Sequence, residues 1–192
     1  MKQKILSIIQ ASLDVKTSVL KDETLNNQLE SLAKACIKSF KAGNKVLFCG
    51  NGGSAADAQH LAAELSGRFY YDRPPLPSEA LHVNTSYLTA VANDYSYDEV
   101  YARLIKGMAK PGDILIGFST SGNSTNVIRA FEEATKAGML TAAFTGNDGG
   151  KMAGLADFNI IIPSADTPRI QEVHILLGHI LCEIIESEMF PQ

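Results

Sequence analysis

Apolar and polar residues alternate along residues 1–42 at the spacing of an α-helix. One apolar stripe comprises Ile5, Ile8, Ile9 and Leu13, and a second comprises Leu29, Leu32, Ala33, Cys36 and Phe40. Lys21-Asp22 separates the two stripes, and Gly43 follows the second, as is usual after the last turn of a helix. The pattern therefore predicts two helices before any strand.

From residue 44 onward, short apolar runs alternate with stretches of helical spacing. The predicted strands are KVLFCG, EALHV, PGDILIGF, LTAAFTG and FNIIIP. The predicted helices are SAADAQHLAAELSGR, residues 86–93 and 97–109, NSTNVIRAFEEATKAGM, GGKMAGLA and residues 169–189. Several strands are apolar throughout, which is typical of a parallel sheet covered on both faces. The sequence thus predicts an α/β fold with a doubly wound, five-stranded, flavodoxin-like parallel sheet.

The chain contains no repeat, low-complexity run or linker, so we expect residues 1–192 to form a single domain. The helical pair at 1–42 should pack on that domain and on other copies of the chain. The stripes of residues 1–20 and 169–189 are long enough to exceed what one sheet can cover. We therefore expect these helices to form an interface between copies of the chain, the alternative being that both pack on their own sheet.

Composition and charge narrow the function. The chain is 45% apolar and 20% charged with a net charge of −4, which argues against a nucleic-acid-binding surface but allows a small phosphate pocket. The chain has three cysteines, an odd number, and none has CxxC spacing. This pattern does not indicate a disulfide framework and favours a protein of a reducing compartment. Neither a signal peptide nor a membrane-length apolar run is present, so we expect a cytoplasmic protein with no membrane contact.

Two loops carry unusual chemistry at predicted strand ends. The first is Gly50-Asn51-Gly52-Gly53-Ser54, whose glycines allow close approach to a ligand at the start of a helix. It also matches GxGxxA, the weak form of a dinucleotide fingerprint. That motif requires an acid at the end of the next strand, where this chain has His82-Val83-Asn84. A nucleotide is therefore not expected.

The second loop is STSGNS, residues 119–124, directly after ILIGF. The loop carries four hydroxyl side chains and one glycine and leads into the N-terminus of a predicted helix, a combination that suits binding of a phosphate monoester. A serine-rich helix cap would explain only one or two of these residues. No Walker lysine is present, so a nucleoside triphosphate is not expected either.

His60 and Glu64 are four residues apart and share one helix face, a spacing that serves metal ligands, an acid–base pair or an ordinary surface pair. The last helix adds Gln171 and His179, which at eight residues apart are separated by about 12 Å. If both serve one site, we expect a neighbouring chain to supply one of them. We expect His174 to be structural.

Five segments in order resemble the phosphoheptose isomerases of the sugar isomerase (SIS) fold. They are GNGGSAADAQHLAAELSGR, AVANDY, GFSTSGNS, TGNDGGKMAG and TPRIQEVHILLGHILCEIIE, and they span nearly the whole chain. The resemblance implies a homotetramer with active sites between subunits. It also implies conversion of sedoheptulose 7-phosphate to D-glycero-D-manno-heptose 7-phosphate, the entry to ADP-heptose and the lipopolysaccharide core.

The resemblance also implies roles for individual residues. Glu64 is similar to the general base and His179 to its acid–base partner. His60, Glu64, Gln171 and His179 are similar to ligands of one zinc ion per subunit. The implied substrate contacts are Asn51, Gly52, Gly53, Ser54, Glu64, Asn93, Asp94, Ser119, Thr120, Ser121, Ser124 and Gln171. Arg68 and Arg169 are weaker candidates for anion contact or support.

A second branch of the same fold resembles this chain nearly as well, namely the tetrameric protein that binds the replication initiator DnaA. The shared features are the NKVLFCGNG start, the NDYSYDEVYAR stretch and the FPQ end. A binding protein does not need the carboxylate and imidazole that stand here as Glu64 and His179, so we expect an isomerase. A sugar-phosphate sensor without chemistry is a third possibility.

Overall fold

The five strands form one all-parallel sheet in the order β2-β1-β3-β4-β5 in the computed structural model, which describes residues 1–192. The strands are β1 (Val46–Gly50), β2 (Ser78–Ala80), β3 (Ile114–Ser119), β4 (Leu140–Gly146) and β5 (Phe158–Ile162). The helices are α1 (Lys2–Lys21), α2 (Glu23–Lys41), α3 (Gly53–Ser66), α4 (Thr85–Asp94), α5 (Val100–Met108), α6 (Thr125–Lys136) and α7 (Thr167–Met189). The order confirms the predicted doubly wound class.

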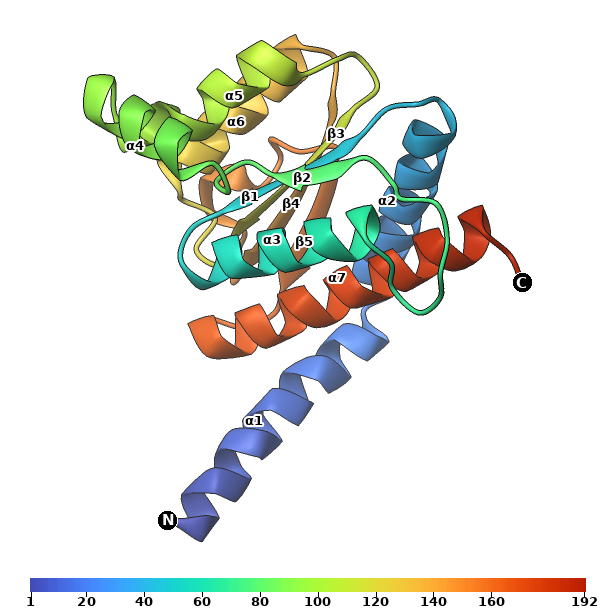
Figure 1. Cartoon of the computed structure of the whole chain (residues 1–192). Coiled ribbons are helices and arrows are strands. Elements are labelled where there is room, and N and C mark those ends of the chain that lie inside the picture. The colour runs from blue at the N-terminus through green and yellow to red at the C-terminus, as the bar shows by residue number, and fades with distance from the viewer.

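Helices cover both faces of the sheet (Figure 1). On one face, α2, α3 and α7 pack around a buried cluster that includes Ile114, Ile116 and Phe118 of β3. On the other face, α5 and α6 pack around a second cluster that includes Leu115 of the same strand. Successive side chains of a strand point to opposite faces. A strand buried on both faces therefore needs an apolar residue at every position, which explains the continuous apolar runs in the sequence.

Two predicted elements are shorter than expected. Only Glu79 and Ala80 of the run EALHV belong to a strand, the three-residue β2, because the chain turns at Leu81-His82 at the edge of the sheet. The segment GGKMAGLA forms a single 3₁₀ turn at Gly150–Met152 and no further helix. Its Met152 N–H donates to Gly122 O at 3.0 Å, so the segment supports the loop after β3.

Helix α1 extends away from the sheet (Figure 1). Val19 is its only buried residue. Its exposed large apolar side chains are Ile5, Leu6, Ile8, Ile9, Leu13 and Leu20. Helices α2 and α7, in contrast, bury apolar faces on their own sheet. The expectation of surplus apolar surface is therefore correct for α1, whereas most of the stripe of α7 is used within the chain. No helix of the protein is both long enough and apolar enough to cross a membrane.

Helices α3 and α7 run side by side and approach each other closely (Figure 1). A Cβ placed on Gly53 would lie 2.8 Å from Gln171 Nε2, and one placed on Gly178 would lie 2.8 Å from Leu61 Cδ2. These two contacts show that the helices are parallel. Leu61 is 1% exposed. A side chain at position 178 would therefore force the buried Leu61 side chain to shift.

We expect Gly178→Ala to lower the free energy of unfolding by about 1–3 kcal/mol, because the added methyl group would overpack the contact with Leu61. Urea denaturation followed by circular dichroism measures this change. Gly107→Ala in α5 is the matched control, since nothing lies within 4 Å of a Cβ there. The control should be neutral or stabilising by up to about 1 kcal/mol. Equal stability of Gly178→Ala and wild type would contradict the close-packing argument.

Candidate functional site

The two predicted ligand loops lie next to each other at the carboxyl ends of adjacent strands. GNGGS follows β1 and STSGNS follows β3, and these strands pair in register with Gly50 opposite Phe118. The helix after β1 covers one face of the sheet and the helix after β3 covers the other. The direction of winding therefore reverses between them, which is where doubly wound folds bind ligands.

A reciprocal amide pair joins the two loops. Asn51 Nδ2 donates to Asn126 Oδ1 and Asn126 Nδ2 donates to Asn51 Oδ1, both at 2.9 Å. The Tyr97 hydroxyl also donates to Asn51 Oδ1 at 3.1 Å, and the Tyr101 hydroxyl donates to Gly50 O at 2.5 Å. Asn51 therefore has one amide hydrogen left for a ligand. Its neighbour Gly52 has φ of 57° and ψ of −122°, a conformation that requires glycine.

The hydroxyls of the second loop are organised before α6 begins. The Ser119 and Ser124 hydroxyls are 2.8 Å apart, and Ser121 Oγ accepts from the Asn123 N–H at 3.2 Å. A pocket of about 360 Å³ opens beside this loop. It is lined by Thr120, Ser121, Asn123, Asn147, Asp148, Ala165, Thr167 and Ile170. The pocket thus lies between the predicted phosphate loop and the first turns of α7.

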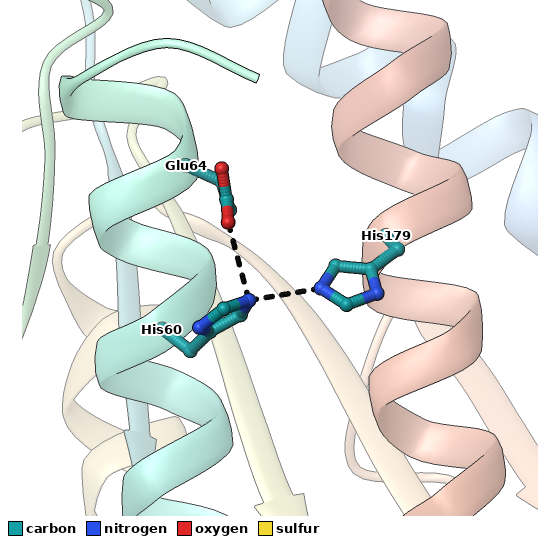
Figure 2. A group of neighbouring side chains, drawn as sticks. All are labelled: His60, Glu64 and His179. Atoms are coloured by element: carbon teal, nitrogen blue, oxygen red, sulfur yellow. Dashed lines mark hydrogen bonds and ion pairs between the residues drawn. The ribbon is translucent and has the colours of Figure 1, made fainter. Parts of the chain in front are cut away.

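His60, Glu64 and His179 form one group between α3 and α7 (Figure 2). His60 Nε2 lies 2.9 Å from His179 Nε2 and 3.2 Å from Glu64 Oε1. His60 is half exposed, and Glu64 is more enclosed. The three side chains offer one ligand atom each within 4.8 Å of one another. All three belong to the same chain.

The donor set and its spacing fit a zinc ion. Imidazole nitrogen and carboxylate oxygen bind zinc at about 2.0–2.2 Å, and two ligand atoms of a tetrahedral site are then about 3.3 Å apart. The two short distances at His60 Nε2, 2.9 and 3.2 Å, are close to that edge length.

Asp57 is a further carboxylate near His60. Burial raises the pKa of Asp57, and the nearby His60 partly offsets this effect. Asp57 Oδ2 has no hydrogen-bond partner.

Gln171, the fourth predicted ligand, lies elsewhere along the helix pair. It is next to Gly53 at the start of α3, whereas His60 is about two turns further along that helix. Gln171 and His179 belong to the continuous helix α7, so their expected separation along one helix is correct. Within one chain, Gln171 is thus nearer the GNGGS loop than the histidine group.

The remaining candidates have varied surroundings. Asn93 and Asp94 occupy the exposed last turn of α4, where Asn93 Nδ2 donates to Asp94 Oδ1 at 2.9 Å. Arg169 pairs with Glu172 and donates to the carbonyl of Ile8 at 3.1 Å, so it joins α7 to α1. Ser54 is buried at the start of α3, and Arg68 is exposed just after that helix.

His174 lies apart from the site and is structural. It is fully buried, and its Nε2 lies 3.1 Å from Thr145 O. Burial lowers the pKa of His174 to about 4, although its hydrogen bond with Thr145 acts in the opposite direction. The imidazole is therefore neutral near pH 7, as expected of a core histidine.

Sequence reasoning missed the residues that hold the site in place. Asn126 is 2% exposed and fixes Asn51, but it follows the STSGNS motif without any distinctive spacing. Phe69 packs against His179, with ring centroids 5.9 Å apart. The buried ion pair of Arg73 and Glu186 lies next to Phe69, whose N–H donates to Glu186 Oε1 at 2.9 Å. An arginine 113 residues from its carboxylate carries no local signal, because only the fold brings the two together.

The chain is similar to known proteins over nearly its whole length. The SIS domain family model matches residues 11–146. The phosphoheptose isomerase of Sulfurimonas denitrificans is 52% identical over 99% of this chain and 97% of its own. The solved structure of phosphoheptose isomerase GmhA from Neisseria gonorrhoeae has a TM-score of 0.91 at 40% identity, covering 97% of this chain and 98% of its own. That of a Francisella tularensis phosphoheptose isomerase has a TM-score of 0.92 at 36% identity, covering 96% and 97%.

The likenesses to the three isomerases cover 96–99% of this chain. Each of these relatives carries the isomerase name, which favours the enzyme over the initiator-binding alternative. The chain belongs to the SIS-domain family and, within it, to the phosphoheptose isomerases.

Proposed function

We propose that the protein isomerises sedoheptulose 7-phosphate to D-glycero-D-manno-heptose 7-phosphate, the first step towards ADP-heptose and the lipopolysaccharide core. The observation that carries this proposal is the grouping of Glu64 with His179 in a chain that is 52% identical to a phosphoheptose isomerase. A carboxylate next to an imidazole provides both proton-transfer groups that a ketose–aldose exchange requires.

In the proposed reaction, Glu64 removes a proton from C1 of the open-chain ketose and returns it to C2. His179 donates a proton to O2 as the C2 carbonyl becomes a hydroxyl, and it accepts the O1 proton as the C1 carbonyl forms. The intermediate is an enediol or enediolate, and no atom is gained or lost. An imidazole suits the oxygen steps because its ordinary pKa is near neutrality.

The proposed phosphate site is the STSGNS loop, with Ser119, Thr120, Ser121 and Ser124 as contacts. Its hydroxyls and the N-terminus of α6 supply many donors and a favourable helix dipole. The GNGGS loop and Gln171 then bind the sugar hydroxyls. Asn93 and Asp94 remain proposed contacts, although in one chain they bond only to each other.

We further propose that His60, Glu64 and His179 hold one zinc ion per subunit through one atom each, and that Gln171 of a second copy is the fourth ligand. This leaves the second carboxylate oxygen of Glu64 and the second ring nitrogen of His179 for proton transfer. Two imidazole nitrogens and a carboxylate oxygen in this arrangement suit zinc. When bound, zinc would polarise the substrate oxygens and favour the negative charge of an enediolate. No nucleotide cofactor is proposed.

The proposed assembly is a homotetramer with shared active sites. Ile170 lines the pocket beside the phosphate loop, and His179 lies nine residues further along α7, or about 13 Å. One chain therefore holds its phosphate loop and its acid–base group well apart, and a second copy can shorten that gap. The apolar stripe of α1 provides surface for the contact. A cytoplasmic location remains part of the proposal.

Glu64→Gln is expected to lower kcat for sedoheptulose 7-phosphate at least about 100-fold, because the amide cannot accept the C1 proton. His179→Gln should have a similar effect. Glu132→Gln, an exposed position on α6 at the opposite face of the sheet, is the matched control and should keep wild-type turnover. Sugar-phosphate binding by a wild type that shows no turnover, with or without zinc, would instead identify a sensor.

Zinc binding can be measured separately from activity. Chelator-stripped wild type titrated with Zn²⁺ should bind about one ion per chain and melt at a higher temperature once loaded. His60→Ala should lose both effects, whereas His82→Ala, outside the group, should retain them. The same zinc content in His60→Ala and wild type would contradict the assignment of His60 as a ligand.

Sedimentation equilibrium tests the assembly. Wild type is expected to show four times the chain mass of 20.7 kDa. The double variant Ile5→Lys/Ile9→Lys should give smaller species with reduced turnover, because it places charges in the exposed apolar stripe of α1. Ser18→Lys adds one charge at an exposed polar position of the same helix and serves as the control. A single-chain mass for wild type would overturn the proposed tetramer.

A further inference from the structure

A buried ion pair lies beneath the acid–base group, where the end of α3 meets the end of α7. Arg73 Nε donates to Glu186 Oε1 at 2.9 Å, and the two side chains are 2% and 1% exposed. Charges so fully removed from water must be satisfied by several hydrogen bonds, because their desolvation is otherwise strongly unfavourable. The hydrogen-bond partners of Arg73 and Glu186 therefore show which backbone groups the ion pair fixes in place.

Glu186 holds the loop after α3. Its carboxylate accepts from the Phe69 N–H at 2.9 Å and the Tyr70 N–H at 2.7 Å, in addition to Arg73. Burial alone would raise the pKa of Glu186, but the two N–H donors and the guanidinium together lower it below its usual value. The residue is thus an anion that fixes two consecutive backbone groups. Phe69, so fixed, packs on the ring of His179.

Arg73 holds the end of α3 itself. Its Nη2 donates to the carbonyl of Glu64 at 2.9 Å, and its Nη1 donates to the carbonyls of Leu65 at 2.8 Å and Gly67 at 3.1 Å. The last carbonyls of a helix lack partners within the helix, and a cation there also interacts favourably with the helix dipole. The guanidinium therefore binds the backbone of the residue proposed as the general base.

We propose that Arg73 and Glu186 are positioning residues for the isomerisation, which set Glu64 and His179 in their mutual geometry. The inference rests on the roles proposed above for those two residues. Glu186 lies seven residues after His179 on α7, two turns along the same side of the helix. The ion pair thus connects the backbone carbonyl of Glu64 to α7, the helix that carries His179. Through the Phe69 N–H it also connects Glu64 to the ring that packs on His179.

The alternative is that the pair serves stability alone, and the chain contains a second buried carboxylate with the same kinds of partner, far from the acid–base group, for comparison. Asp113 accepts from the N–H groups of Lys45 and Lys110, at 3.1 and 2.8 Å, and from Lys45 Nζ at 2.5 Å. Like Glu186, it is 1% exposed and binds two backbone N–H groups and one cation. It precedes β3, at the end of the sheet opposite the ligand loops. Asp113→Asn is therefore a matched control for Glu186→Gln.

The test compares kcat and KM for sedoheptulose 7-phosphate in these two variants, at a temperature where both are folded by circular dichroism. Glu186→Gln is expected to lower kcat about 10- to 100-fold with KM within about twofold, since misplacement of a reacting group by about 1 Å costs about 100-fold. Asp113→Asn should lose stability and keep the wild-type kcat. Equal kcat values for the two variants would overturn the proposal.

Two further variants keep the test decisive if Glu186→Gln does not fold. Arg73→Lys keeps the charge opposite Glu186 but cannot span three carbonyls, so kcat should still fall about 10-fold. Arg73→Met/Glu186→Gln removes both charges and leaves an acceptor for the loop, and should fold with similarly low kcat. Wild-type kcat in both would refute the positioning role. Full turnover by Glu64→Gln would instead refute the roles proposed for the acid–base pair, whatever these variants do.

Discussion

The close contact between α3 and α7 is the constraint on which the site depends. Gly178 lets the Leu61 side chain of α3 lie directly against the backbone of α7, and His60 and His179 are the neighbouring residues on the two helices. Without that spacing, the two imidazoles could not come within 2.9 Å. Side-chain packing sets this separation, because two helices this close tolerate little change in the volume of the side chains between them. The chemistry is thus placed by an apolar contact that takes no part in it.

The sheet provides the second half of the site by a different mechanism. Reversal of winding between β1 and β3 leaves the carboxyl ends of both strands open, and the amide pair of Asn51 and Asn126 then fixes the distance between their loops. Backbone support comes from the glycine-rich segment after β4, through the hydrogen bond from Met152 to Gly122. The two loops are therefore already held in place before any ligand binds, which reduces the entropy lost on binding.

The proposed site has two parts, the loops at the strand ends and the acid–base group, which are rigid for different reasons and are separated along α7. The loops are held by hydrogen bonds between polar groups, whereas the acid–base group is held by helix packing above the buried pair of Arg73 and Glu186. A single α7 carries Ile170 at the pocket of one half and His179 in the other. A rigid helix keeps these two positions about 13 Å apart, and this separation is the reason for proposing that a second copy completes the site.

The sequence by itself determined the strand–helix order, the parallel sheet, the two ligand loops and the spacing of His60 with Glu64. Those features depend on local periodicity, glycine and neighbouring residues on one helix face. Only the tertiary structure decided that His179 joins them while Gln171 lies beside Gly53, and that α1 is left exposed. It alone revealed the roles of Asn126, Arg73 and Glu186. Their partners are distant in the sequence, so side-chain packing and buried hydrogen bonds across the fold, rather than any local pattern, select them.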